Sequence, residues 1–388
     1  MRVLHIGKFL PPDMGGMESF LGDLMEAQTS GSVEAGAVVH AGARSSGVVR
    51  ATEAGRVWRV PMMGQLLYTP VSPSFSWRLS DAIRRFRPDV LHIHLPNPSA
   101  FCALVSPAAR ALPWVVHWHS DVVFPPGRTA LQGALRTYRL FERRLLERAE
   151  CVIATSPPYA ASSLPLAPYR HKVEIVPLGL DPRRLESTDS ARDWAETQWN
   201  ASGLRLLGVG RLAHYKGFNT LIQALAHAKG VQARVVGEGE MYEALDAQIR
   251  SAALSDRVRL MGACSDDQRN ALLRSCDALV LPSVERTEAF GVVLLEAMAL
   301  GKPVVASAIP GSGPAWVVDA QTHGWHVNPG DVDGLARALN DCAQDEAKRS
   351  LFGIAGKARF EECFHIDAVA SRLDNLYHEV LRSLRGAA

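Results

Sequence analysis

The sequence lacks any apolar run long enough to cross a membrane, and its N-terminal apolar stretch soon breaks at Pro11-Pro12. A membrane span needs about 20 apolar residues, so any membrane contact is expected to be peripheral. The stretch is also too short for a secretory signal, and we therefore expect a cytoplasmic protein. The six cysteines include no CxxC pair, so a zinc ribbon or a redox dithiol is not predicted.

Net charge is nearly absent as well, because 42 basic residues face 40 acidic ones for a formal charge of +2. Binding to a phosphate backbone is not implied for the whole chain, and no nucleic-acid partner is expected. Most of the basic residues are arginine, so each of the scarce lysines is informative. With 388 residues, 47% of them hydrophobic, the chain is long enough for about two globular domains.

Short apolar runs alternate with longer amphipathic segments, a rhythm typical of parallel βαβ units. Strands are expected in the first half at residues 2–7, 89–94, 114–119, 151–156 and 173–178. The pattern restarts at 205–210, 233–239, 258–262, 277–283, 303–307 and 324–329. The polar segment 181–203 is predicted to be the interdomain connection. We therefore expect an α/β protein with two doubly wound Rossmann-like domains, 1–180 and 204–365, and ligands in the cleft between them.

A glycine pair follows the first expected strand, in the stretch PPDMGGMESF. Gly15 and Gly16 permit a tight turn, and the N–H groups of the helix start after them would form an anion site. The spacing is not the GxGxxG dinucleotide fingerprint, so a nicotinamide cofactor is not predicted. A plain tight turn is an equally good interpretation of this motif taken alone.

Two cations lie in the strand-to-helix loop of the stretch VGRLAHYKGF. Arg211 and Lys216 would be unfavourable beside a helix N-terminus unless an anion joined them. The planar guanidinium fork and the compact ammonium together suit a pyrophosphate. The alternative is a solvated turn with incidental charges.

Two glutamates stand in the apolar stretch EAFGVVLLEAMALGKP. Glu288 lies at the expected helix start, where capping alone would explain it. Glu296 lies in the second turn among apolar residues, where a carboxylate is expected to accept hydrogen bonds from a vicinal diol such as a ribose. A buried salt bridge is the alternative for Glu296.

The histidines include two HxH pairs, His92 with His94 and His117 with His119. Residues i and i+2 share one face of a strand, so four imidazoles could gather at one sheet edge and bind a metal. No carboxylate or cysteine completes a familiar ligand set, and we expect no metal. A single functional histidine is favoured, with His119 nearest the strand end.

Two further features receive structural interpretations. The DVD at 331–333 resembles a metal-binding DxD, but its setting predicts an aspartate that caps a helix. The basic amphipathic segment 129–150 is interpreted as an ordinary domain helix, with contact to an anionic membrane surface as the alternative.

These motifs occur in a specific order: GG, then HSD, VGRL…KG, VGEGE and EAFGVVLLEAMALGKPVVAS. In this order they resemble a retaining glycosyltransferase of family 4 with the two-domain GT-B fold, and the resemblance covers nearly the whole chain. It implies a nucleotide-sugar donor, held mainly by the C-terminal domain, and no cofactor. It also implies that the last helix, 366–384, crosses back to the first domain.

The resemblance assigns roles to individual residues. In the C-terminal domain Arg211 and Lys216 would neutralise the donor diphosphate, Glu296 would hold the ribose, and Glu288 would contact the transferring sugar. The further positions it implies are Gly15 and Gly16 at the diphosphate, His119 beside the reacting centre, the backbone of Phe290, Gly291 and Val292 near sugar and phosphate, and Ala263 and Cys264 near the base.

Two positions depart from the family pattern. Leu178 stands where many members carry Asn, and Ala315 stands where many carry a glutamate. Both glutamates of the long motif are intact, so activity is still expected, with an altered environment for the donor or acceptor sugar.

We therefore expect transfer of a hexose, with mannose from GDP-mannose favoured over UDP-sugars, to a glycan or polyprenyl-linked glycan acceptor in bacterial surface polysaccharide synthesis. Peripheral contact with the inner face of the cell membrane is kept open. The alternatives are a sugar-nucleotide epimerase, a non-catalytic nucleotide-sugar-binding protein and a metal-dependent hydrolase built on the histidines.

Overall fold

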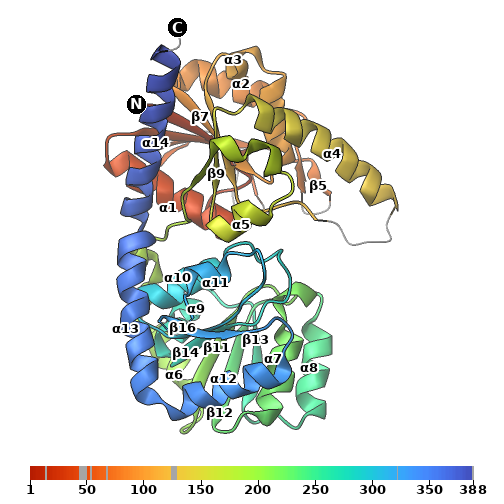
Figure 1. The fold of residues 1–388 in the computed structure, drawn as a ribbon, viewed down its shortest axis with the longest axis vertical. Helices are drawn as coiled ribbons and strands as arrows, with labels where there is room; N and C mark the ends of the chain where they lie inside the picture. The colour runs from red at the N-terminus through yellow and green to blue at the C-terminus, as the bar shows by residue number, and fades with distance from the viewer. Residues whose placement is uncertain are drawn as a thin grey trace. The chain divides into compact units, whose positions relative to one another are not determined.

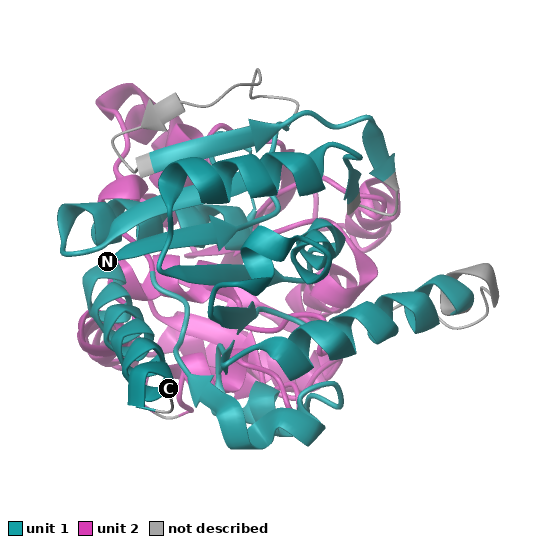
Figure 2. Cartoon of the chain, turned by 90° about the horizontal axis from the view of Figure 1, so that it is seen from above, with its two compact units in different colours: residues 1–179, 366–388 teal, residues 180–365 magenta. Residues whose placement is uncertain are grey.

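The computed structural model describes residues 1–13, 15–42, 50–52, 55–66, 69–123, 129–320 and 322–386. Met14, within the predicted glycine turn, lies outside the described residues. The chain divides into two compact units, each described by itself: unit 1 is residues 1–179 with 366–388, and unit 2 is residues 180–365 (Figure 2).

Unit 1 is built on an eight-stranded sheet with the order β10-β9-β8-β7-β1-β2-β4-β3. Its described strands pair in parallel except for β3, which runs antiparallel to β4. The strands are β1 (Arg2–Ile6), β2 (Glu34–His40), β3 (Arg50–Thr52), β4 (Gly55–Val60), β7 (Val90–Leu95), β8 (Trp114–Trp118), β9 (Cys151–Ala154) and β10 (Val173–Ile175). A separate antiparallel hairpin joins β5 (Gly64–Leu66) to β6 (Thr69–Val71).

Helices cover this sheet, as the near-continuous apolar strands require. Every residue of β7 and β8 is buried. The helices are α1 (Gly16–Ser30), α2 (Phe75–Phe86), η1 (Pro98–Leu104), α3 (Pro107–Arg110), α4 (Thr129–Arg148), α5 (Pro157–Ser162), η2 (Ala167–Lys172) and α14 (Ile366–Gly386). The C-terminal helix α14 lies beside α1 (Figure 1), so the last segment of the chain is part of unit 1, as predicted for 366–384.

Unit 2 is built on a six-stranded parallel sheet with the order β13-β12-β11-β14-β15-β16. The strands are β11 (Leu204–Val209), β12 (Val231–Val236), β13 (Val258–Gly262), β14 (Ala278–Leu281), β15 (Val304–Ser307) and β16 (Gly324–Val327). In order of occurrence this is 3-2-1-4-5-6, the Rossmann arrangement, whose strand order reverses between β11 and β14. Ligands of such sheets bind beyond the carboxyl ends of the strands at that reversal.

The helices of unit 2 connect its strands. They are η3 (Pro182–Leu185), α6 (Asp189–Thr197), η4 (His214–Lys216), α7 (Phe218–His227), α8 (Tyr242–Ser251), α9 (Asp266–Ser275), α10 (Val292–Ala299), α11 (Pro314–Val317), α12 (Val332–Gln344) and α13 (Glu346–Cys363). The core needs a small residue in β11, because a Cβ on Gly208 would come within 3.0 Å of the Phe218 ring of α7. Asp331 caps α12 by accepting a hydrogen bond from Gly334, which confirms the structural interpretation of the DVD.

The segment 181–203, expected to be the interdomain connection, is instead a folded part of unit 2. Its helix α6 packs against α9, and Trp199 donates a hydrogen bond of 2.9 Å to Ser275. The polar composition that suggested a linker belongs to an amphipathic helix that buries Ala191 and Ala195. The chain changes unit after Gly179 and again after His365.

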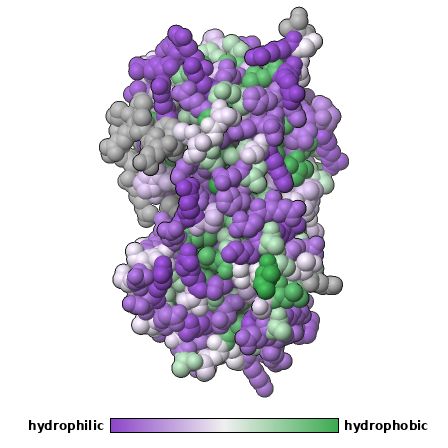
Figure 3. All heavy atoms as spheres, turned by 90° about the vertical axis from the view of Figure 1, so that its left-hand side faces the viewer, coloured by the Kyte–Doolittle hydropathy of each residue, from purple (hydrophilic) through white to green (hydrophobic). Residues whose placement is uncertain are grey.

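The outer surface of α13 and α14 is largely hydrophilic, with scattered apolar side chains (Figure 3). Leu351 and Ile354 of α13 are among the exposed apolar residues. No described helix is both long and apolar enough to span a bilayer.

Two glycines of unit 2 have nearly the same backbone φ but differ in how closely their surroundings are packed. Gly217 and Gly230 have φ of +68° and +66°, but a Cβ on Gly217 would overlap the carbonyl oxygen of Pro282, while one on Gly230 meets nothing within 4 Å. We expect Gly230→Ala to lower the free energy of unfolding by about 1–2 kcal/mol through backbone strain alone. Gly217→Ala should lower it by about 2–5 kcal/mol, since overpacking adds to the strain. Urea unfolding of both variants checks this, and equal losses would contradict it.

Candidate functional site

A buried ion pair joins the two loops at the strand-order reversal of unit 2. Lys216, at the end of η4 after β11, donates a hydrogen bond of 2.5 Å from Nζ to Oε2 of Glu288, in the loop after β14. Ser283 donates to the same oxygen at 2.9 Å. The side chains are 12% and 9% exposed, so both charges lie largely out of water. The structure thus brings together two of the residues that the sequence predicted for the site.

Lys216 stays cationic in this setting. Burial alone would lower its pKa, but the charge of Glu288 and its hydrogen bond outweigh burial, so the pKa of Lys216 is raised above its ordinary value. Both bonds to Glu288 end on Oε2, and Oε1 receives none from the described residues. Glu288 is therefore held by one oxygen and retains the other as an acceptor.

Close backbone contacts hold the neighbouring loops in place. A Cβ on Gly237, just after β12, would overlap the carbonyl oxygen of Gly210, and one on Gly239 would overlap the backbone of Leu212. The glycines of the VGEGE motif are thus required for packing against the β11 loop. Arg211 lies on that loop and donates 3.0 Å to Glu240, with 41% of its side chain exposed.

The start of α10 faces the same edge of the sheet. Gly291 caps the helix with φ of +79°, and Val292 is its first residue. The loop before it is held by the β15–α11 connection, since Ser312 bonds the carbonyl oxygen of Glu288 and Gly313 bonds that of Ala289 at 2.9 Å. The free N–H groups at this helix start give a positive end beside Glu288.

Glu296 is not unpaired, although the sequence places it among apolar residues. Arg184 of η3 donates 3.0 Å and Arg269 of α9 donates 3.2 Å, both to Oε1. The carboxylate is 5% exposed. The salt bridge considered as an alternative for Glu296 is therefore present, but Oε2 receives no bond from the described residues. A second acceptor can still be offered to a ligand.

The predicted base-binding residues follow β13, which is separated from β11 by one strand of the sheet. Ala263 and Cys264 come directly after Gly262, which ends β13 with φ of +65°. Ser265 then caps α9 with a full capping box. Burial raises the pKa of the Cys264 thiol, so this cysteine is not set up as a nucleophile.

In unit 1 the predicted glycine turn begins α1, with Gly15 as its cap and Gly16 as its first residue. A Cβ on Gly15 would overlap the carboxylate of Glu18, which lies against the helix start. Burial raises the pKa of Glu18, and the nearby charge of Lys8 partly opposes that shift. The side chain of Glu18 therefore lies at the helix start where the sequence predicted an anion site.

The two HxH pairs gather in the middle of the unit 1 sheet, with His94 of β7 in register with His117 of β8. The sequence missed a fifth member, His5 of β1, which bonds His94 at 3.1 Å. His94 also bonds His119, just beyond β8, at 3.0 Å. All five rings are at most 4% exposed. His5 could have been recognised from the sequence, because it stands in an apolar strand where a histidine must be buried.

Burial lowers the pKa of every histidine in this cluster. The value is about 4 for His5 and about 3 for His119, and it lies well below the ordinary range for His92, His94 and His117. The rings are therefore neutral near pH 7. Both nitrogens of His117 are buried without a hydrogen-bond partner among the described residues.

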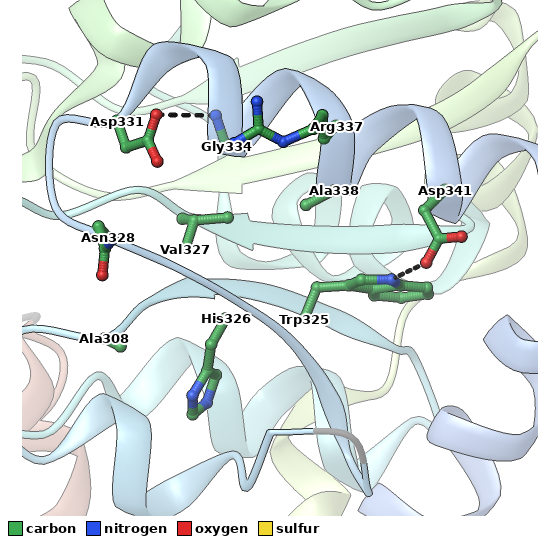
Figure 4. Close-up of a pocket in the computed structure, with 10 residues that line it drawn as sticks. All are labelled: Ala308, Trp325, His326, Val327, Asn328, Asp331, Gly334, Arg337, Ala338 and Asp341. Atoms are coloured by element: carbon green, nitrogen blue, oxygen red, sulfur yellow. Dashed lines mark hydrogen bonds between the residues drawn. The ribbon is translucent and has the colours of Figure 1, made fainter.

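A cavity of about 380 Å³ flanks the edge strand β16 and helix α12 in unit 2 (Figure 4). Trp325 lines it and donates 2.6 Å to Asp341, and Arg337 of α12 is a further lining residue. Its lining includes none of the predicted site residues, so the ion pairs described above, and not this cavity, define the candidate site.

Comparisons with known proteins identify the family. Residues 15–179 match the family described as Glycosyl transferase 4-like domain, and residues 191–359 match Glycosyl transferases group 1. The chain is 29% identical to O-antigen chain mannosyltransferase C of Escherichia coli, over 99% of this chain and 100% of that protein. It is 30% identical to glycogen synthase of Mycobacterium tuberculosis, over 78% of this chain and 71% of that protein.

Among solved structures, Anabaena HepE in complex with UDP-glucose is similar in fold. The TM-score is 0.74 and the identity 23%, over 99% of this chain and 100% of that one. The expected pair of parallel-sheet, Rossmann-like α/β units is thereby confirmed.

Acid should destabilise unit 1 through its buried histidines. Because their folded pKa values lie below 6.5, the unfolded chain binds protons that the folded one does not, and stability falls as pH falls from about 6.5 toward 4. Each such histidine contributes about 1.4 kcal/mol per pH unit in that window. We expect His117→Leu to be nearly neutral at pH 7 and to reduce the acid sensitivity by one histidine.

Calorimetric melting between about pH 7 and pH 5 measures this dependence. His378→Gln, at an exposed position of α14, is the control and should leave the slope unchanged. A wild-type stability that does not vary across this interval would contradict the prediction.

Proposed function

Because this chain belongs to the glycosyltransferases of the GT-B fold, we propose that it transfers a hexose from a nucleotide-sugar donor to a hydroxyl group of a glycan or polyprenyl-linked glycan. We place it in family 4, with retention of configuration. Mannose from GDP-mannose is the favoured donor, in bacterial surface polysaccharide synthesis. The similarity to an O-antigen mannosyltransferase along the whole chain supports this choice.

The observation that carries the proposal is the ion pair between Lys216 and Glu288 at the strand-order reversal of unit 2. Departure of a nucleoside diphosphate leaves negative charge on its phosphates. Lys216, Arg211 and the N–H groups at the start of α10 would stabilise that charge electrostatically. The nearby Glu288, with Oε1 open, would then accept a hydroxyl of the transferring sugar.

Glu296 would anchor the ribose through Oε2. Its Oε1 is held by Arg184 and Arg269, so the carboxylate keeps one orientation before any ligand arrives. A charged acceptor contributes about 1.5–3 kcal/mol to each hydrogen bond it makes. The salt bridge and the ribose role are therefore compatible, because they use different oxygens.

The reaction that we propose is a same-face displacement in which the donor C1–O bond to the diphosphate breaks as the acceptor oxygen bonds to C1. The acceptor proton goes to the leaving phosphate oxygen. Lys216 and Arg211 supply the positive charge, so the proposal requires neither a metal nor a cofactor. Transfer that persists in a chelator would support this part of it.

Two alternatives keep the same fold. UDP-sugars are the rival donors, since HepE was solved with UDP-glucose. A sugar-nucleotide epimerase would use the same diphosphate site but leave its product attached to the nucleotide. We also propose a cytoplasmic location, with peripheral membrane contact through the basic helix α4 as a further alternative.

Removing Lys216 should abolish most transfer. We expect Lys216→Ala to lower kcat by about 10²–10³-fold, since a preorganised cation at the leaving group is lost. Exposed Lys229→Ala serves as the control and should transfer normally. Because Lys216→Ala leaves Glu288 buried without its cation, the variant can also lose stability by about 3–5 kcal/mol.

A second variant separates these effects. Lys216→Met combined with Glu288→Gln removes both charges and should melt close to wild type while remaining inactive. A folded double variant with near-normal transfer would refute the diphosphate assignment.

The donor and the ribose anchor can be tested together with a panel of nucleoside diphosphates and nucleotide sugars. Bound ligand raises the melting temperature by mass action, and we expect GDP and GDP-mannose to give the largest shifts. Glu296→Gln should weaken binding of the best ligand by about 10–150-fold in calorimetry. Exposed Glu243→Gln of α8 is the control. If Glu296→Gln lowered stability but left affinity unchanged, Glu296 would be a structural salt bridge only.

A further inference from the structure

A chain of hydrogen bonds runs through the interior of unit 1 from His119 to helix α14, with a branch from Gln28 to Tyr377. Nε2 of His119 lies 3.0 Å from Nδ1 of His94, and Nε2 of His94 lies 3.1 Å from Nδ1 of His5. Nε2 of His5 then lies 2.9 Å from Oε1 of Gln28 on α1. The amide nitrogen of Gln28 donates 3.0 Å to Asp374 on α14.

The end of this chain determines the direction of every bond in it. Burial raises the pKa of Asp374, and the hydrogen bond from Gln28 opposes that shift. An ionised Asp374 only accepts, so Gln28 turns its NH₂ group toward Asp374 and its carbonyl oxygen toward His5. A carbonyl oxygen also only accepts, so His5 carries its proton on Nε2 and its Nδ1 is an acceptor. The same step repeats once for His94 and once for His119. Each of the three rings is then protonated on Nε2 alone.

The argument requires rings with a single proton, and burial provides this condition. It lowers the pKa of His5 to about 4 and that of His119 to about 3, and it holds the pKa of His94 well below 6.5. A neutral imidazole has one donor and one acceptor nitrogen, and its partner decides which is which. No ring in the chain has a spare proton that would reverse a bond.

The last atom of the chain is Nδ1 of His119. It is buried and has no hydrogen-bond partner among the described residues. Because the other nitrogen carries the proton, Nδ1 offers a lone pair and nothing else. A hydroxyl group can satisfy it by donating, whereas an ionised phosphate or carboxylate oxygen, which also only accepts, cannot.

We propose that Gln28 and Asp374 are positioning residues that fix the tautomer of His119, so that its Nδ1 binds a hydroxyl-donating group of the substrate. The identification of that group as a sugar hydroxyl rests on the proposed function. The tautomer itself is a property of unit 1 and does not depend on it. His119 thus recognises the sugar and not the diphosphate.

Two groups of these histidines bring ring nitrogens within 4.8 Å of one another: His5 with His92 and His94, and His94 with His117 and His119. Ring stacking disfavours a metal ion in the second group. The rings of His117 and His119 lie parallel to within 6°, with centroids 4.2 Å apart. Imidazole lone pairs lie in the ring planes, so parallel, offset planes do not converge on one ion as a tetrahedral site requires. The hydrogen bonds of His94 also occupy both of its nitrogens.

The test is NMR of protein labelled with nitrogen-15 in its histidines, which distinguishes the two neutral tautomers by the shifts of the ring nitrogens. The spectrum of His119→Gln assigns the His119 signals. In the wild type we expect His119 protonated on Nε2 alone. In Gln28→Met, which keeps the volume but removes the acceptor, we expect the two tautomers of His119 in comparable populations.

A double variant that exchanges the acid and the amide should restore the wild-type tautomer of His119. Gln28→Glu with Asp374→Asn keeps an acceptor facing His5 and a donor on α14, so the wild-type tautomer should return. Glu379→Gln, an exposed acid-to-amide change on α14, is the matched control and should change nothing. A wild-type His119 protonated on Nδ1, or a folded Gln28→Met with an unchanged tautomer, would overturn the proposal.

Two further measurements keep the outcomes distinct. Zinc bound stoichiometrically to the purified chain and shifting His119 would overturn the proposal in favour of a metal site. Transfer by Gln28→Met should fall in proportion to the lost Nε2–H population and recover in the double variant. If the wild type shows the expected tautomer but transfers no sugar, the proposed function fails while the positioning role of Gln28 and Asp374 stands.

Discussion

The candidate site depends on one electrostatic constraint, the buried pair of Lys216 and Glu288 across the strand-order reversal of unit 2. Burying two charges costs several kcal/mol per ion, and a well-packed apolar pair is often no less stable. Folding stability alone therefore does not favour such a pair. The loops around it are nevertheless packed closely, with Gly217 and Gly237 at positions where a Cβ would overlap a neighbouring carbonyl oxygen. This rigidity holds a cation and a carboxylate where a parallel α/β sheet binds its ligand.

Much of the fold could be predicted from the sequence, because strands buried on both faces appear in it as short apolar runs. The runs at 258–262 and 303–307 coincide with β13 and β15 to within a residue. Strands β2 and β4 and the short edge strand β3 were missed, and β2 is buried but rich in alanine and glycine, which carry little strand signal. The segment 181–203 was misjudged because a polar helix and a linker have similar composition. Only packing of α6 on α9 separates the two.

Part of the candidate site could also be predicted from local sequence. Local context singled out Lys216, Glu288 and Glu296, since each is a charge at a strand end or in an apolar helix. Their partners could not be read in the same way, because Arg184 lies 112 residues from Glu296 in sequence. The histidine pairs were equally visible, but Asp374 lies 346 residues from Gln28, the residue it orients. Long-range pairing is set by the topology of the sheet, which no local pattern encodes.

Three side chains are each held by hydrogen bonds at one polar atom, while their other polar atom has no partner among the described residues. Glu288 is held at Oε2 and open at Oε1, and Glu296 is held at Oε1 and open at Oε2. His119 is held at Nε2, and its buried Nδ1 has no hydrogen-bond partner among the described residues. In each case the bond that fixes the side chain also fixes the orientation of the remaining polar atom, and for His119 it fixes the tautomer as well. All three open atoms are then acceptors, and acceptors match a substrate rich in hydroxyl groups. Held in place by these bonds, each acceptor would not need to reorganise when a ligand binds.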